Sequence, residues 1–121
     1  MIRLVLPYPV SGNRYWRIAR NRLYRSKEAL EYRREVALLA CKRGYIEPLT
    51  GGVIVRMALC PKLTKRGLAS ETRIDLDNCL KVALDALQGV AFENDKQIVK
   101  IVAEIGPAQV GGALMVEIEG A

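Results

Sequence analysis

Hydrophobic and polar positions alternate with two different periods along this chain of 121 residues. Short apolar segments rich in β-branched residues predict strands at 2–6, 52–60, 97–105 and 113–119. In two other segments the apolar residues recur at steps of three and four, the period of an amphipathic helix. We expect one helix from a Ser26 cap to about Arg43, and a second from Asp77 through Gln88.

The apolar faces and the ends of these helices follow from the same pattern. The first stripe is Ala29, Tyr32, Val36, Leu39 and Ala40, and the second is Leu80, Ala83, Leu84 and Leu87. Gly44 and Gly89 are expected to end the two helices. Prolines and arginines in 7–25 predict a long ordered loop or arm, and 61–73 predicts a basic loop. The glycines between 106 and 112 favour a hairpin joining the last two strands.

The predicted order of elements is β-α-β-α-β-β. A chain of this length suits one ordinary domain. We therefore expect an α+β fold over residues 1–121, with two helices packed on one face of a mixed sheet of about four strands.

The amino-acid composition restricts the classes of function that the chain can have. Nineteen Lys and Arg against thirteen Asp and Glu give a net charge of +6, which favours nucleic acid, or less strongly an acidic membrane surface, as a partner. The alternative is a merely basic soluble domain. The absence of histidine excludes Ser-His and Cys-His catalysis and any His-ligated metal. A metal would have to be a hard cation bound by oxygen ligands.

The cysteines and the hydropathy pattern indicate the cellular compartment of the protein. Three cysteines without CxxC spacing are expected to be buried small hydrophobes in a reducing compartment; they are Cys41, Cys60 and Cys79. Charges and prolines interrupt every apolar stretch, so neither a signal peptide nor a membrane span is predicted. We expect a cytoplasmic protein with no membrane partner.

Three acids form the candidate chemistry. Asp75 and Asp77 flank Leu76, and positions two apart in an extended segment project to the same side. Two crowded carboxylates repel unless a cation neutralises them. With Asp95, which precedes the third strand, they would form an oxygen site for Mg²⁺ that leaves positions for phosphate and water. Lys81, one helical turn after Asp77, would place a positive charge near the phosphate.

Each of these residues also has a purely structural interpretation. An Asp-x-Asp pair before a helix is typical of an N-cap with a second acid favoured by the helix dipole. Lys81 is expected in that case to be a surface partner of Asp77. Asp85 is a solvated or structural helix acid, and Asp95 is a turn residue whose role Glu93 competes for. The combination of acids favours a catalytic site, whereas no single acid does.

A basic stretch supplies the expected nucleic-acid surface. Residues 14–34 hold eight Lys and Arg and two Glu, interleaved with the aromatic Tyr15, Trp16 and Tyr24. Such a pattern suits phosphate contacts together with stacking on unpaired bases. The alternative is a solvated helix face with core-facing aromatics. The predicted DNA-binding residues are Arg14, Tyr15, Trp16, Arg17, Arg20 and Arg22, extended toward the acids by Lys62, Lys65, Arg66 and Arg73.

The chain resembles the RusA family of endodeoxyribonucleases. The similarity lies in Asp75-Leu76-Asp77-Asn78, Lys81, Asp85-Ala86-Leu87 and Asn94-Asp95-x-Gln97-Ile98, and in an opening motif Leu6-Pro7-Tyr8-Pro9-x-Ser11-x-Asn13-Arg14-Tyr15-Trp16-Arg17. It covers nearly the whole chain, as a single RusA-like endonuclease domain.

This resemblance implies a magnesium-dependent homodimer that resolves Holliday junctions by paired symmetric nicks, with Mn²⁺ as a substitute metal. A two-fold dimer with one site per subunit matches the two strands to be cut. The essential carboxylates would be Asp75, Asp77 and Asp95, with a functional lysine at Lys81. The alternatives are a non-catalytic basic nucleic-acid-binding module and a metal nuclease acting on other branched DNA or RNA.

Overall fold

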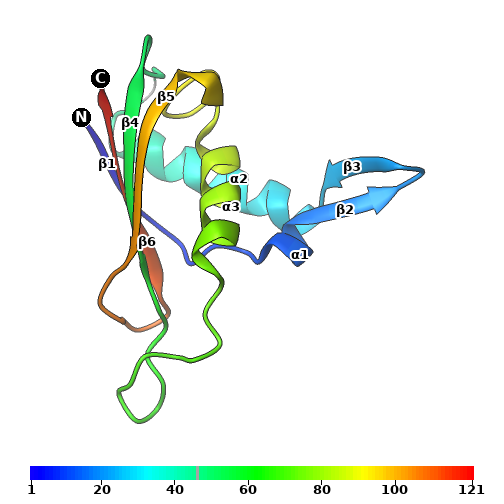
Figure 1. Ribbon diagram of the computed structural model, residues 1–121, viewed down its shortest axis with the longest axis vertical. Helices are drawn as coiled ribbons and strands as arrows, with labels where there is room; N and C mark the ends of the chain where they lie inside the picture. The colour runs from blue at the N-terminus through cyan, green and yellow to red at the C-terminus, as the bar shows by residue number, and fades with distance from the viewer. Residues whose placement is uncertain (46) are drawn as a thin grey trace.

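The computed structural model describes residues 1–45 and 47–121. Its main sheet has four strands in the order β1-β6-β4-β5, and two long helices cover one face of it (Figure 1). The strands are β1 (Ile2–Leu6), β4 (Val53–Cys60), β5 (Ile98–Ile105) and β6 (Ala113–Gly120), and the helices are α2 (Lys27–Lys42) and α3 (Leu76–Leu87). The predicted α+β class with a four-stranded mixed sheet is confirmed.

The predicted hairpin between the last two strands is wrong. β4 pairs with β5 in parallel, through the crossover helix α3, and with β6 in the antiparallel sense. β6 thus lies between β4 and β1. Strands in a sheet are about 4.8 Å apart, so the connection from β5 across β4 covers only about 10 Å. The glycine-rich connection 106–112 is long enough to make this step.

Helix α2 follows its prediction closely. The Ser26 hydroxyl accepts a hydrogen bond of 3.1 Å from the backbone N–H of Ala29, which caps the first turn. Gly44 follows the last turn at a φ of +84°, a conformation that glycine adopts without strain. The predicted stripe is buried against the sheet except for Leu39, which is half-buried; the buried members are Ala29, Tyr32, Val36 and Ala40.

Helix α3 begins at Leu76, one residue earlier than predicted, with Asp75 at the N-cap. Its buried face is also rotated: Leu80 and Leu84 are only half-buried, whereas the buried residues are Cys79, Val82, Ala83, Ala86 and Leu87. The small residues among them let α3 approach its neighbours α1, α2 and β5 closely. The two leucines border this contact.

Residues 7–25 form more structure than the predicted loop. A short helix α1 (Gly12–Tyr15) is followed by a two-stranded hairpin of β2 (Trp16–Ala19) and β3 (Arg22–Arg25). The turn residues Arg20 and Asn21 have φ values of +51° and +61°, as in the type I′ turns that join two-residue hairpins. The hairpin projects from the body of the molecule (Figure 1).

Two further expectations concern the cysteines and the membrane. Cys60 and Cys79 are buried thiols, as predicted, but Cys41 is exposed because it lies on the solvent side of the last turn of α2. Over residues 1–45 and 47–121, none of the helices has the length and apolarity needed to span a bilayer.

Candidate functional site

The acid pair lies at the start of α3, with both carboxylates exposed. Asp75 occupies the N-cap position, yet its side chain makes no capping hydrogen bond. Asp77 lies in the first turn, where the positive end of the helix dipole favours an anion. Asp75 therefore does not act as a side-chain cap, and the carboxylate oxygens of Asp75 face the solvent at the start of the helix.

Tyr8 holds the segment that leads into this pair. Its hydroxyl accepts a hydrogen bond of 2.8 Å from the backbone N–H of Ile74. The ammonium of Lys62 lies 5.0 Å from the centroid of the Tyr8 ring, a cation–π contact. A Cβ at Gly112 would lie 2.5 Å from the same ring, so this contact requires glycine. Tyr8 thus links the acid pair to the basic 61–73 loop.

A second close approach comes from α1. A Cβ at Gly12 would lie 2.7 Å from Oδ1 of Asn78, the residue after Asp77. The start of α1 therefore packs directly on the start of α3. Tyr8, Gly12 and Asn78 were not predicted as site residues, although Tyr8 and Asn78 belong to the two motifs and Gly12 falls at an unspecified position of the opening motif. In the structure the opening motif and the Asp-x-Asp-Asn motif lie side by side, which their spacing in the sequence does not reveal.

Asp95 lies at the other end of α3. It begins the short 3₁₀ helix η1 (Asp95–Gln97), which Figure 1 shows beyond the upper end of α3, whereas the acid pair is at the lower end. The twelve residues of α3 span about 18 Å at 1.5 Å each. The side chain of Gln97 fixes η1 near the start of β4, since its Nε2 donates to the carbonyls of Leu49 and Gly51 at 2.9 Å.

One subunit consequently does not bring the three predicted ligands together. Among the residues that the structure describes, no group of three His, Cys, Asp or Glu is placed to hold a metal ion. Asp75 and Asp77 have the right donor chemistry for a hard cation, because carboxylate oxygens are its preferred ligands. Asp95 is exposed at the opposite end, and Glu93 lies exposed at that same end. The expectation that the three acids converge within one chain is corrected.

Lys81 is exposed on α3, one turn beyond Asp77 and one turn before Asp85. None of the ion pairs among residues 1–45 and 47–121 involves it, so the expected surface pair with Asp77 is not formed. Lys81 lies on the same flank of α3 as Asp77 and Asp85, because the three residues follow one another at steps of four.

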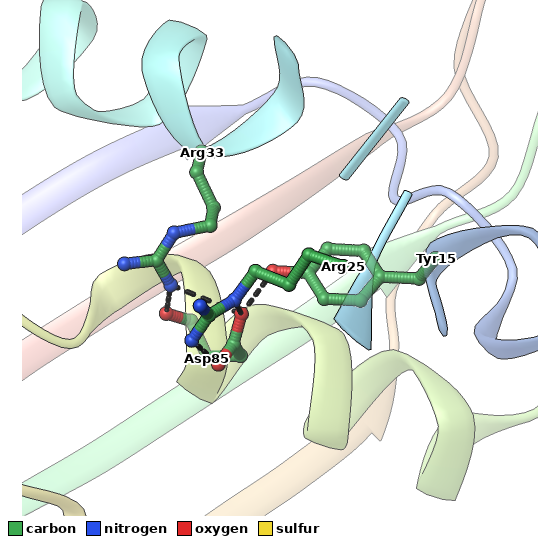
Figure 2. A network of polar contacts seen from close by, with 4 residues as sticks. All are labelled: Tyr15, Arg25, Arg33 and Asp85. Atoms are coloured by element: carbon green, nitrogen blue, oxygen red, sulfur yellow. Dashed lines mark hydrogen bonds and ion pairs between the residues drawn. The ribbon is translucent and has the colours of Figure 1, made fainter. Parts of the chain in front are cut away.

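Asp85 is the centre of a polar network rather than a solvated acid (Figure 2). Its carboxylate accepts bonds of 2.8 and 2.7 Å from Nε and Nη2 of Arg25, and one of 3.0 Å from Arg33. The Tyr15 hydroxyl also donates to it, and Arg33 donates to the Asp85 backbone carbonyl. Because Arg25 is the last residue of β3, the network ties the base of the hairpin to α3. The structural interpretation of Asp85 is the correct one.

Charge states in the network follow from burial and these contacts. Burial alone raises the pKa of Asp85, but hydrogen bonds from Arg25 and Tyr15 and the charges of Arg25 and Arg33 together hold the pKa below its usual value. Burial, followed by the hydrogen bond to Asp85, raises the pKa of Tyr15 to about 12. At neutral pH the network thus contains an ionised carboxylate, two guanidinium groups and a neutral phenol.

The predicted DNA-contacting residues between positions 14 and 22 divide into three groups. Tyr15 is fully buried and bonded to Asp85, so its predicted stacking on bases is wrong. Trp16 is half-buried, edge-on to Tyr15 with 5.0 Å between ring centroids, and lies under the Arg25 guanidinium. The arginines of α1 and the hairpin are exposed; they are Arg14, which pairs with Glu28, and Arg17, Arg20 and Arg22.

The 61–73 loop folds into a small hydrogen-bonded turn below α3. Backbone bonds join Thr64 to Leu68 at 2.7 Å and Ser70 to Lys62 at 2.9 Å. This turn holds its four basic residues on the outside, next to the segment that precedes the acid pair; they are Lys62, Lys65, Arg66 and Arg73. The loop thus presents positive charge beside two carboxylates.

Comparisons with known proteins agree with one another. A family model described as "Endodeoxyribonuclease RusA" matches residues 7–119. A crossover junction endodeoxyribonuclease rusA of Enterobacteria phage HK97 is 33% identical over 117 residues, which cover 96% of this chain and 92% of that protein. The crossover junction endodeoxyribonuclease RusA of Escherichia coli strain K12 is 35% identical over 112 residues, 92% of this chain and 88% of the relative. A protein of the same name from Enterobacteria phage 82 is 32% identical, with the same shares covered.

Proposed function

The chain belongs to the RusA family of endodeoxyribonucleases, and from that premise we propose that it nicks four-way DNA junctions by hydrolysing phosphodiester bonds. Relatives named for crossover junctions align with more than nine tenths of the chain. The proposal includes a cytoplasmic location, where such DNA is encountered.

The observation that carries a catalytic assignment is the position of Asp75. A carboxylate at an N-cap normally accepts a bond from the helix backbone, and here it does not. Two exposed acids two residues apart are held at a defined place by Tyr8 and by the Gly12–Asn78 contact. Asp75 and Asp77 are therefore the proposed catalytic acids, with Lys81 as the cation that approaches the scissile phosphate.

The same acids would hold a divalent cation, Mg²⁺ or Mn²⁺. When bound, such a cation supplies charge stabilisation at the phosphate and lowers the pKa of a bound water. The chain's own part is to orient the DNA. The β2–β3 hairpin, which carries exposed arginines, projects to one side of α3, and the basic 61–73 loop lies below the start of α3 (Figure 1). Both can contact the phosphates of a junction arm.

The distance between Asp95 and the acid pair favours a homodimer in which each nuclease site is shared by the two subunits. One chain keeps Asp95 about a helix length from the acid pair, roughly 18 Å. If Asp95 has the role that its motif implies, it must act on the acid pair of a second subunit. A two-fold dimer would then have two equivalent composite sites, one for each strand cut in a symmetric resolution.

The competing function is a basic module that binds branched DNA without cutting it. Purified protein is incubated with a synthetic four-way junction in Mg²⁺, in Mn²⁺ and in EDTA, beside duplex and RNA controls. We expect nicking of the junction with either metal, none in EDTA, and none with Asp77→Asn. That variant should bind the junction in EDTA at least as tightly as the parent chain, because it removes negative charge near the phosphates. Binding without cleavage in either metal contradicts the proposal.

A further inference from the structure

The β2–β3 hairpin carries an apolar pair of side chains near its turn. Ile18 and Leu23 lie directly opposite one another in the two strands, so their side chains share one face of the hairpin. Both are left in solvent, with 76% of Ile18 and 63% of Leu23 exposed. Single exposed hydrophobics are common on protein surfaces, but these two form a contiguous apolar patch on a hairpin that projects from the body (Figure 1). We call Ile18 and Leu23 the tip pair.

The charges around the tip pair indicate what covers it. Residues 16–25 contain four arginines and no Asp or Glu. The arginine at the base of the hairpin is bound to Asp85, whereas the three nearer the turn are exposed and join none of the ion pairs in the described part of the chain; they are Arg17, Arg20 and Arg22. Two such hairpins would repel one another. The patch instead matches a polyanion that also exposes apolar faces, and DNA has both, in its phosphates and in its bases.

A branch point differs from duplex DNA in the base faces that it leaves open. Within a duplex both faces of each base pair are covered by stacking, and a side chain that enters must first unstack a step. At the centre of an open four-way junction, the last base pair of each arm has no neighbour on its inner side. Aliphatic side chains such as Ile and Leu are among those that proteins insert between bases. Covering an open face costs no unstacking, so the tip pair gains more at a junction than in a duplex.

We propose that Ile18 and Leu23 insert at the branch point of four-way DNA, cover the open base faces there, and so determine the preference for junction over duplex. The proposal rests on the proposed nuclease function and assigns its structure selectivity to two side chains. The hairpin is placed relative to the acid pair because Arg25 at its base is bound to Asp85 of α3. Asp77 lies in the first turn of the same helix. A tip pair held at the branch point therefore fixes how far along an arm the acid pair lies.

The preference is measured in EDTA, by titrating a four-way junction and a duplex of the same sequence. Ile18→Thr with Leu23→Thr places β-branched residues, which suit strands, and removes the apolar surface. This variant should bind the junction about tenfold more weakly, because burial of two aliphatic side chains is lost, and the duplex equally well, because phosphate contacts dominate there. Ile18→Leu with Leu23→Ile keeps an apolar pair and should keep the preference. Val5→Thr with Leu38→Gln removes two comparably exposed apolar side chains from β1 and α2 and should change neither affinity.

Trp16, the only tryptophan of the chain, reports whether the hairpin stays folded. It lies on the same face as the tip pair, edge-on to Tyr15 and under the Arg25 guanidinium. An unchanged emission maximum in the double Thr variant shows that the base of the hairpin is intact. With the base intact, equal losses on junction and duplex, or no loss on either, overturn the proposal. A change in the sedimentation of the free protein, or in its binding to phosphatidylserine vesicles, with junction affinity unchanged also overturns it.

Photocross-linking locates the tip pair on the DNA without relying on the double Thr variant. The chain with p-benzoylphenylalanine at position 18 should cross-link to nucleotides next to the exchange point, and cross-links confined to the middle of the arms overturn the proposal. All of these measurements are made without a divalent metal. Binding with the expected preference but no cleavage in Mg²⁺ or Mn²⁺ therefore refutes the proposed function and leaves the tip pair standing, whereas cleavage by a double Thr variant that keeps the full preference does the reverse.

Discussion

Replacing Asp85 by asparagine should lower the free energy of unfolding by about 2–4 kcal/mol. The side chain keeps its size, but the amide loses the charge and one of the two acceptor oxygens that Arg25, Arg33 and Tyr15 use. Tyr15 is buried, so its hydroxyl must share the one remaining oxygen with the two arginines and gains no water in exchange. The loss stays below that of a fully buried ion pair, because the Arg25 side chain is 38% exposed.

The difference between the two proteins should depend on pH in one direction. The pKa of Asp85 is lowered in the folded state, so its stabilisation is fully present above the ordinary carboxyl value of 3.8 and is lost as the pH falls through the folded value. The parent and Asp85→Asn should thus differ by a constant amount from about pH 5 to pH 8. Below about pH 4 the difference should shrink.

Urea unfolding followed by circular dichroism at pH 7 and pH 3 measures both effects. Glu28→Gln is the matched control, since it makes the same chemical change in the exposed pair with Arg14 and should cost less than about 1 kcal/mol. A loss at Asp85 no larger than that of the control would refute the network as the anchor of the hairpin. So would a difference that is unchanged at pH 3.

Three further substitutions probe the supports of the site. Gly12→Ala should displace the Asn78 side chain and slow junction cleavage several-fold, with little change in melting temperature; equal losses of both would indicate a folding defect. Tyr8→Phe removes the acceptor for the Ile74 N–H and should cost about 0.5–1.5 kcal/mol in urea unfolding, together with a fall in cleavage rate; an unchanged rate would remove Tyr8 from the site. Arg20→Asn places a residue that tolerates positive φ at position 20 and should raise the free energy of unfolding by up to about 1 kcal/mol. The same change should weaken junction binding and reduce its salt dependence, and an unchanged salt dependence would exclude a phosphate contact by this side chain.

Local patterns predicted most of the fold. The Ser26 cap, the Gly44 terminus and the strand at Val53–Cys60 are determined by residues close in sequence and by the periodicity of the apolar positions. The structure has all three within a residue or two of their predicted positions. The hairpin at 16–25 was missed because arginines occupy positions on both of its faces, which hides the alternation. The order of β5 and β6 was missed because strand pairing is decided by long-range packing.

The site was predicted only in part. The Asp-x-Asp spacing identified an exposed pair at a helix start, and the structure places it there. The predicted helix between Asp77 and Asp95 already separated the two acids, but the sequence left open whether residues 89–94 return along that helix. The structure keeps Asp95 beyond its far end. Tyr15 was assigned to DNA for its arginine neighbours, yet burial and the bond to Asp85 make it part of the core. The Tyr15–Asp85 contact joins residues seventy positions apart, beyond the reach of any local pattern.

Complementation of two inactive variants tests the shared site most directly. Asp77→Asn and Asp95→Asn are refolded together, so that half of the dimers contain one subunit of each kind. If the acids act across subunits, every mixed dimer has one intact site, and the mixture should nick single strands of a four-way junction at about a quarter of the parent's site concentration. The pair Asp75→Asn with Asp77→Asn should stay inactive, because both changes fall in the same acid pair. A mixture of Asp77→Asn and Asp95→Asn as inactive as its parts would contradict the account.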